Sequence, residues 1–272
     1  MTTFLTCSPD HYGILYEINP WMSKSRGVDS NKARQQWDSL YKLLTETLGI
    51  TVEKLSPVQG LPDMVFTANA GLVVGNLAGD APRFFMSRFR HDVRQGECLH
   101  YEKWFCMRGF QIEVPPPNIY FEGEGDALWV GEKLFLGCQI RTDSVAAPWL
   151  AERLNRRVYP LGLVDPRFYH LDTCFCPLDN KRVLYYPNAF SPSSQKIIKE
   201  MIPCPMPIEK ADALNFGANA IVVQNHLVLN AGCTNLSKTL MDEGLTVHPI
   251  DLSEFIKAGG SAKCLILKIS DV

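Results

Sequence analysis

Five short stretches of the chain repeat one pattern, in which a small or polar residue leads into an apolar, strand-forming run. They are 68–74, 125–130, 171–176, 218–223 and 262–267. The residue at the repeated position is Asn69, Asp126, Asp172, Asn219 and finally Cys264, at steps of 57, 46, 47 and 45 residues. A nearly constant spacing of this length is typical of repeated supersecondary units. In the fifth copy a thiol replaces the Asn or Asp.

The segments between these stretches predict a helix, a glycine that ends it and an outer strand. Ser30 is the predicted N-cap of the first helix and Gly49 ends it. The predicted elements are helices over 30–48, 97–108 and 235–243, and strands over 50–55, 110–114, 133–137, 226–230 and 245–248. Five such units can close into a ring. The residue that starts each central strand would then face one central cavity.

Composition and charge favour a globular protein that handles a small molecule. The chain has 272 residues, of which 46% are hydrophobic and 21% charged, and we expect one domain over 1–272. A net charge of −2 gives no field that attracts nucleic acid or acidic lipid. The N-terminus lacks a leader pattern and no apolar run is long enough to span a membrane, so we expect a cytosolic location. Assembly into a homo-oligomer is left open.

The nine cysteines indicate reduced thiols, because they are odd in number and scattered. One alternative is a zinc site built from His170, Cys174 and Cys176. No fourth ligand with recognisable spacing accompanies them, so no metal is predicted.

Asn and Asp at the repeated position have a simpler explanation, since both residues commonly turn or cap a chain. That explanation accounts well for Asn219. It does not account for Cys264, which follows Gly259 and Gly260 in a glycine-rich approach that lets the backbone come close to a ligand.

Five segments, considered together, resemble the guanidine-modifying superfamily of arginine deiminases, dimethylarginine dimethylaminohydrolases and amidinotransferases. They are 7–12, 18–22, 62–71, 168–177 and 259–264, and they resemble most the arginine dihydrolase domain of cyanobacterial bifunctional enzymes. The resemblance implies an α/β fold, the five-bladed pseudo-symmetric α/β propeller called the pentein fold. It also implies hydrolysis without a cofactor.

The resemblance implies three catalytic residues, Cys264, His170 and Glu122. A guanidinium carbon needs a soft nucleophile, which Cys264 would supply. A nearby protonated histidine and the bound cation would lower the pKa of its thiol. His170 would protonate the departing ammonia and then deprotonate water. Glu122 would orient the histidine or hold the guanidinium.

Six further residues are implied to bind substrate. Asp63 would hold guanidinium nitrogens, and Arg88 and Arg141 would pair with the α-carboxylate of arginine or a methylated arginine. Asp126 is a weaker candidate, because the repeat itself gives it a capping role. Arg90 and Arg94 are interpreted as ordinary surface arginines. The last two candidates are amides, Asn69 and Asn19.

Asn69 departs from the aspartate that deiminases and dimethylaminohydrolases usually carry. An amide can both donate and accept, so it suits a cationic guanidinium and a neutral ureido group alike. With Asn19 it is implied to permit a second hydrolysis, which would take arginine to ornithine, CO2 and two NH3. A second departure is Cys233, which could be mistaken for the nucleophile.

Other functions stay open. Within the class they are a one-step deiminase that releases citrulline and a dimethylarginine dimethylaminohydrolase. Outside this class, the alternative is a catalytically inactive propeller that senses arginine or binds proteins. The 272 residues do not contain the ornithine-processing domain of the bifunctional enzymes, so we expect any ornithine to leave for another enzyme.

Overall fold

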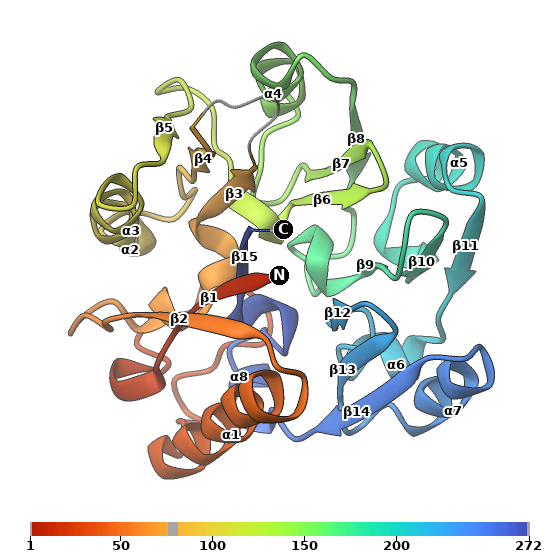
Figure 1. The fold of residues 1–272 in the computed structure, drawn as a ribbon, viewed down its shortest axis with the longest axis horizontal. Coiled ribbons are helices and arrows are strands. Elements are labelled where there is room, and N and C mark those ends of the chain that lie inside the picture. The colour runs from red at the N-terminus through yellow and green to blue at the C-terminus, as the bar shows by residue number, and fades with distance from the viewer. Residues whose placement is uncertain (1, 76–80, 271–272) are drawn as a thin grey trace.

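The computed structural model describes residues 2–75 and 81–270. Within this part of the chain, fifteen strands form five three-stranded sheets, which surround the middle of the molecule with helices on the outside (Figure 1). In sheet order, the strands are β15-β1-β2 (Leu267–Ser270, Thr3–Cys7, Thr51–Leu55), β3-β4-β5 (Gly71–Val74, Arg83–Met86, Gln111–Glu113), β6-β7-β8 (Ala127–Val130, Lys133–Cys138, Val158–Gly162), β9-β10-β11 (Phe175–Pro177, Arg182–Tyr185, Cys204–Pro207) and β12-β13-β14 (Ile221–Val223, His226–Asn230, Thr246–Ile250).

Every sheet has the same topology. The middle strand is antiparallel to the inner strand and parallel to the outer strand. Parallel neighbours need a crossover, and a helix makes it in each unit. The crossover helices are α1 (Ser30–Lys42), α2 (Asp92–Gln95) with α3 (Glu97–Cys106), α4 (Ala146–Leu154), α5 (Pro192–Met201) and α7 (Thr234–Asp242), while the short α6 (Lys210–Leu214) and α8 (Ser253–Ile256) lie between units.

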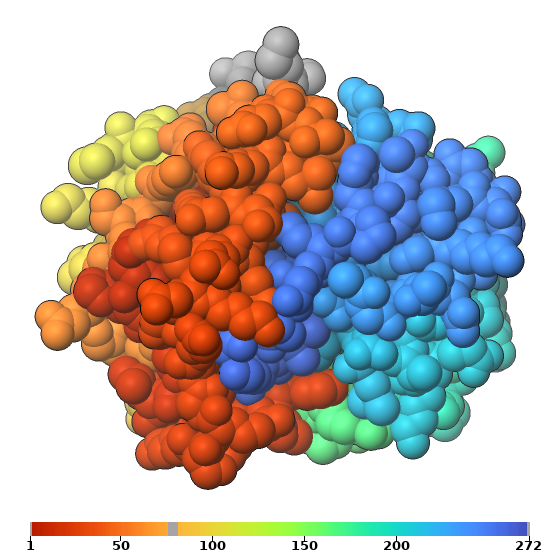
Figure 2. Space-filling model, turned by 90° about the horizontal axis from the view of Figure 1, so that it is seen from below, coloured from red at the N-terminus to blue at the C-terminus, as the bar shows by residue number. Residues whose placement is uncertain are grey.

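The first sheet joins the two ends of the chain. β15 is antiparallel to β1, with Leu5 opposite Leu267, so the last strand supplies the inner strand of the first unit. Seen from below, the N-terminal segments lie directly against the C-terminal ones (Figure 2). The hydroxyl of Thr6 adds a hydrogen bond to the Leu265 carbonyl at 2.8 Å.

The helices and strands predicted from apolar spacing are confirmed. Trp37, Leu40 and Leu44 are buried against the first sheet, as the helical periodicity requires. The predicted cap was wrong by one residue, because Asp29 accepts the Lys32 amide hydrogen bond at 3.0 Å and begins α1. The end of the predicted helix is a π-helical turn, η2 (Leu43–Thr47). No described helix is long and apolar enough to cross a membrane.

The repeated residues do not start the inner strands, as the sequence predicted, but precede them. Four short 3-10 turns lie just before β3, β6, β9 and β15, and they are η4 (Thr67–Ala70), η5 (Gly123–Gly125), η6 (Leu171–Thr173) and η8 (Lys263–Leu265). Turn η4 contacts η5 and η8, and η5 contacts η6. Because a turn can aim a side chain along the inner edge of a sheet, residues from different units meet near the centre.

Candidate active site

Cys264 lies in turn η8 and is held by residues of two neighbouring units. Its thiol donates to Asp172 Oδ2 at 3.3 Å and accepts from Asn219 Nδ2 at 3.1 Å. The Asn219 Oδ1 atom in turn accepts from the backbone N–H of Cys264 at 3.3 Å. Only 3% of the cysteine is exposed. One amide therefore fixes both the backbone and the sulfur of this residue.

The approach to Cys264 depends on glycine. Gly259 has φ +87°, a left-handed conformation that favours glycine, and a Cβ there would lie 2.8 Å from the Tyr169 hydroxyl. That hydroxyl instead donates to the Gly259 carbonyl at 2.7 Å. The glycine thus lets the chain before the thiol pack against the residue next to His170.

Burial keeps the cysteine protonated in the free protein. Desolvation raises the pKa of the Cys264 thiol well above its usual range, and the Asp172 carboxylate adds to the effect. Burial also raises the pKa of Asp172 to about 7, although Lys263 and the thiol hydrogen bond oppose the rise. The pair holds a proton that a bound cation would help to release.

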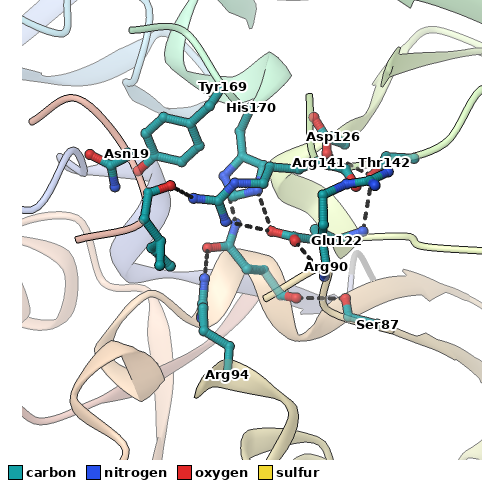
Figure 3. A network of polar contacts seen from close by, with 12 residues as sticks. Asn19, Ser87, Arg90, Arg94, Glu122, Asp126, Arg141, Thr142, Tyr169 and His170 are labelled. Carbon is teal, nitrogen blue, oxygen red and sulfur yellow. Dashed lines mark hydrogen bonds and ion pairs between the residues drawn. The ribbon is translucent and has the colours of Figure 1, made fainter. Parts of the chain in front are cut away.

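His170 forms a polar network with Glu122 and Arg141, in which Glu122 and Arg141 are an ion pair (Figure 3). Its Nε2 lies 2.7 Å from Glu122 Oε2, and Arg141 Nη1 donates to the same oxygen at 3.2 Å. The Arg141 guanidinium also stacks over the Tyr169 ring, 4.6 Å from its centroid. Its Nη2 donates to the Ile18 carbonyl at 2.9 Å, which ties this network to the segment that carries Asn19.

Burial favours the neutral form of His170, whereas the sequence prediction was a protonated partner for the cysteine. Burial lowers the pKa of His170 to about 4, even though Glu122 favours its protonation. Burial opposes ionisation of Glu122 as well. The Arg141 guanidinium and the hydrogen bond from His170 nevertheless hold the pKa of Glu122 well below its usual range. The carboxylate is charged and the imidazole beside it is not.

Asn69 connects His170 to a buried arginine. Its Nδ2 lies 3.4 Å from His170 Nδ1, and Arg94 Nη1 donates to its Oδ1 at 2.8 Å. Gly125 makes room for this contact, since a Cβ there would lie 2.3 Å from the Asn69 amide nitrogen. Arg94 is 3% exposed and makes two hydrogen bonds to Glu97, which is fully buried.

Two buried carboxylates each keep one oxygen without a hydrogen bond among the described residues, Oδ1 of Asp63 and Oδ1 of Asp172. Burial raises the pKa of Asp63, and the nearby Arg94 opposes that rise. Buried polar atoms normally have partners, so such vacancies point to a ligand that donates hydrogen bonds. A guanidinium group, which has only donors, fits them.

Three of the predicted substrate-binding residues are engaged elsewhere. Thr142 Oγ1 and the Leu171 N–H donate to the two carboxylate oxygens of Asp126 at 2.6 and 3.0 Å, so Asp126 is held by the scaffold and its role in binding substrate stays a prediction. Asn19 donates to the Ala258 carbonyl at 3.0 Å and accepts from the Trp21 N–H at 2.9 Å. Its amide therefore ties the 18–22 segment to the chain before Cys264.

Arg88, the third, turns its side chain towards another loop. Its Nη2 donates to the Pro115 carbonyl at 3.1 Å, and its buried Nε has no partner among the described residues. Arg90 has a more central place than its interpretation as a surface residue suggested. Its backbone N–H donates to Glu122 Oε1 at 3.0 Å, and its guanidinium pairs with Asp143.

The sequence interpretation missed three residues of this site, Asp172, Asn219 and Arg94. The first two occupy the repeated position of their units, which is the signal that could have found them. Both residues were instead interpreted as capping residues. Arg94 carried a weaker signal, a glutamate three residues later, and such pairs usually lie on helix surfaces.

The zinc alternative finds no support in the geometry. The Cys174 thiol faces the carbonyls of His170 and Leu171, and the Cys176 thiol faces that of Ala220. No cluster of three potential ligands that could hold a metal occurs among the described residues. Cys233 lies apart at the start of α7, where its thiol faces the carbonyls of Asp212 and Asn215.

Access to the site is closed in this conformation. Cavities of about 420 and 150 Å³ share Glu124, Trp129 and Lys268 in their walls, but neither is lined by Cys264 or His170. Cys264 and His170 are themselves at most 3% exposed. The 18–22 segment is tied to this region through the Ile18 carbonyl and the Trp21 indole N–H.

No family model matches the chain. The chain is 42% identical to a bifunctional arginine dihydrolase/ornithine cyclodeaminase from Nostoc sp., over 98% of its own residues. It spans 38% of that longer protein. It is also 38% identical to an N(G),N(G)-dimethylarginine dimethylaminohydrolase of Mycobacterium tuberculosis, covering 96% of this chain and 83% of the relative.

A solved structure gives the same result in three dimensions. The N-terminal domain of ArgZ, a cyanobacterial arginine dihydrolase with its product bound, superposes with a TM-score of 0.93 at 40% identity. The match covers 99% of this chain and 98% of that one. The chain therefore belongs to the guanidine-modifying superfamily that includes these dihydrolase domains and the dimethylarginine dimethylaminohydrolases.

Proposed function

We propose that the protein is an arginine dihydrolase, which hydrolyses free L-arginine to ornithine, CO2 and two NH3 through a covalent cysteine intermediate. The observation that carries the proposal is the match to the ArgZ dihydrolase domain over 99% of the chain. The site supports it, because the chain has a buried thiol and an Asn69 amide beside the buried histidine.

The substrate guanidinium binds to the unpaired oxygens of Asp63 and Asp172. Its positive charge lowers the pKa of the Cys264 thiol, which attacks the guanidinium carbon. The thiol proton ends on the departing nitrogen, so ammonia leaves and an amidinium group stays bonded to the sulfur. Asp172, which accepts the thiol hydrogen bond, and His170 relay this proton.

Water then attacks the sulfur-bound carbon and gives a proton to His170, with Glu122 stabilising the imidazolium that forms. The C–S bond breaks, which restores Cys264 and forms citrulline. In the second round the sulfur attacks the ureido carbon, and a second ammonia leaves. Water releases a carbamate that breaks down to ornithine and CO2. Asn69 serves both rounds because its amide accommodates a charged or a neutral group.

Arg88 and Arg141 remain the predicted ligands of the α-carboxylate. Asn19 remains a predicted substrate contact from the 18–22 segment. The unpartnered Nε of Arg88 supports its part. Asn219 holds the nucleophile and is assigned a positioning role. No metal or other cofactor takes part in this scheme.

The five sheets around the centre support a five-bladed α/β propeller, formed by residues 1–272 as one guanidine-modifying hydrolase domain. The partner is a small molecule, and neither nucleic acid nor membrane is needed. The cytosolic location and the homo-oligomer stay predictions from the sequence.

A second candidate is a dimethylarginine dimethylaminohydrolase, favoured by the 38% identity to the relative of that name. One experiment separates the activities. Purified protein is incubated with L-arginine and, separately, with asymmetric dimethylarginine, and ornithine, citrulline, ammonia and dimethylamine are measured. We expect about two ammonia per ornithine from arginine. Citrulline as the sole end product would overturn the dihydrolase, and dimethylamine release without turnover of arginine would favour the second candidate.

A further inference from the structure

The scheme above leaves Arg94 without a task, although it is a fully buried cation next to the site. Its guanidinium donates from Nε and Nη2 to the two Glu97 oxygens at 2.7 and 2.8 Å. The Nη2 group also donates to the Asp63 carbonyl at 3.2 Å, and Nη1 donates to Asn69 Oδ1 at 2.8 Å. Phe89 covers one face of the group, 4.3 Å from its ring centroid. Four hydrogen bonds and a ring leave this side chain little freedom.

These contacts decide which way the Asn69 amide faces. A guanidinium has only donors, so the atom that meets Arg94 must be an acceptor. That atom is Oδ1, and the amide N–H group is consequently the one that lies 3.4 Å from His170 Nδ1. A flipped amide would place two donors against each other at the arginine. The orientation is thus set by chemistry and not only by the shape of the side chain.

The amide orientation in turn decides where the imidazole carries its proton. Because Asn69 presents N–H to Nδ1, that nitrogen must offer a lone pair. The other nitrogen, Nε2, lies 2.7 Å from the charged Glu122 carboxylate and must donate. Both contacts are satisfied by one neutral tautomer, protonated at Nε2.

We infer that Arg94 is a positioning residue, which acts through the Asn69 amide to keep the proton of His170 on Nε2. The tautomer is a property of the free protein, whereas the consequence for turnover rests on the dihydrolase function proposed above. A histidine held in this form can take a proton only at Nδ1, the nitrogen that faces Asn69. Arg94 therefore helps to determine which nitrogen acts as the base for the hydrolytic water.

A purely structural role is the competing explanation, since Arg94 and Glu97 form a buried pair at the start of α3. The two roles differ in what they change. A structural pair alters stability when either partner is lost. A positioning arginine alters the histidine when it is lost, whereas Glu97 can be changed without removing the donor to Asn69.

The test is nitrogen NMR on protein that contains ¹⁵N-labelled histidine, with the His170 signals assigned by their absence in a His170→Gln variant. We expect the wild type to hold the Nε2–H form over the Nδ1–H form by at least tenfold. The double change Arg94→Met with Glu97→Met removes both members of the pair together, and Asp63, whose Oδ2 lies 3.8 Å from Arg94 Nε, is the buried carboxylate that loses a nearby cation. It should lower the tautomer ratio at least fivefold. Glu97→Gln is the matched control, which we expect to lower stability but leave the ratio within twofold.

Kinetics supply a second measurement. We expect kcat for ornithine formation to fall about tenfold or more in the double variant, because a misplaced base loses alignment, while KM stays within about threefold. If the double variant does not fold, Arg94→Gln with Glu97→Gln replaces it, since an amide can meet Asn69 in either orientation. An Nδ1–H wild type, or a ratio unchanged without Arg94, would overturn the inference. A correct tautomer in a protein that does not hydrolyse arginine would instead sink the proposed function.

Discussion

Replacing Asp172 by Asn should stabilise the protein and abolish its activity. The folded protein disfavours the charged carboxylate, because burial raises the pKa of Asp172 from 3.8 to about 7. Below pH 3.8 the group is protonated in both the folded and the unfolded state, so its raised pKa does not change the free energy of unfolding. As the pH rises towards 7, the unfolded chain loses this proton first, and the folded state loses stability.

The size of the effect follows from the shift. A difference of about 3 pKa units corresponds to about 4 kcal/mol of unfolding free energy above pH 7. The substitution also removes a carboxylate that stabilises the charged Lys263 ammonium, so the increase in stability should be smaller than the pKa shift alone implies. Its ion pair with Glu124, at 2.7 Å, remains in the variant. We therefore expect Asp172→Asn to add about 2 to 4 kcal/mol at pH 8 and almost nothing at pH 4.

Urea unfolding at pH 4, 6 and 8 measures this difference directly. Asp242→Asn, at an exposed position at the end of α7, makes the same change in charge and should shift stability by less than about 0.5 kcal/mol at every pH. A variant that is less stable than the wild type at pH 8 would refute the reasoning. That result would mean that Asp172 serves chiefly as a partner for Lys263, whose buried charge would then be poorly compensated. Loss of turnover in the stabilised variant would show that stability is given up at this position for function.

Three other predictions concern the remaining residues of the site. Cys264→Ser should abolish turnover while calorimetry still detects arginine binding, because Asp63 and Asp172 keep their free oxygens; residual product formation would contradict Cys264 as nucleophile. Asn69→Asp should shift the product from ornithine towards citrulline and raise the pKa of His170, since a carboxylate beside Nδ1 favours the imidazolium; an unchanged product ratio and pH–rate profile would refute both effects. The lowered pKa of His170, about 4, makes the wild type lose about 3 kcal/mol of unfolding free energy as the pH falls from 6.5 to 4, and His170→Gln should remove this loss. Urea titrations at both pH values measure the difference, and an equal loss in the two proteins would count against it.

The repeat and the apolar spacing predicted most of the fold. Trp37, Leu40 and Leu44 mark a buried helical face in the sequence, and the structure confirms it. The end of the first helix was equally predictable, because Gly49 has the positive φ that favours glycine after a helix. The cap was missed because Asp29 and Ser30 are both good N-caps, and only the hydrogen bond to Lys32 distinguishes them.

The division of labour among the repeated residues could not be predicted from their own positions. Asp126 and Asp172 occupy the same place in their units, yet one accepts from Thr142 and a backbone N–H while the other meets the thiol. Which carboxylate stays available depends on side chains from neighbouring units. Sequence spacing carries no information about that.

Arg94 shows the same limit for a single residue. Its charge suggested the surface, where an arginine three residues from a glutamate contributes little. Its burial arises because Glu97, Asp63 and Asn69 come together from three separate elements.

The pairing of β15 with β1 also determines when the candidate active site is first complete. Cys264 lies three residues before β15, and β15 pairs with β1 from the beginning of the chain. During synthesis a growing chain already contains His170, Asp63 and Asp172 while it still lacks the sulfur of Cys264. The site is therefore complete only once β15 has paired with β1. A protease that removed β15 would take away a support of Cys264 without cutting at any other residue of the candidate site.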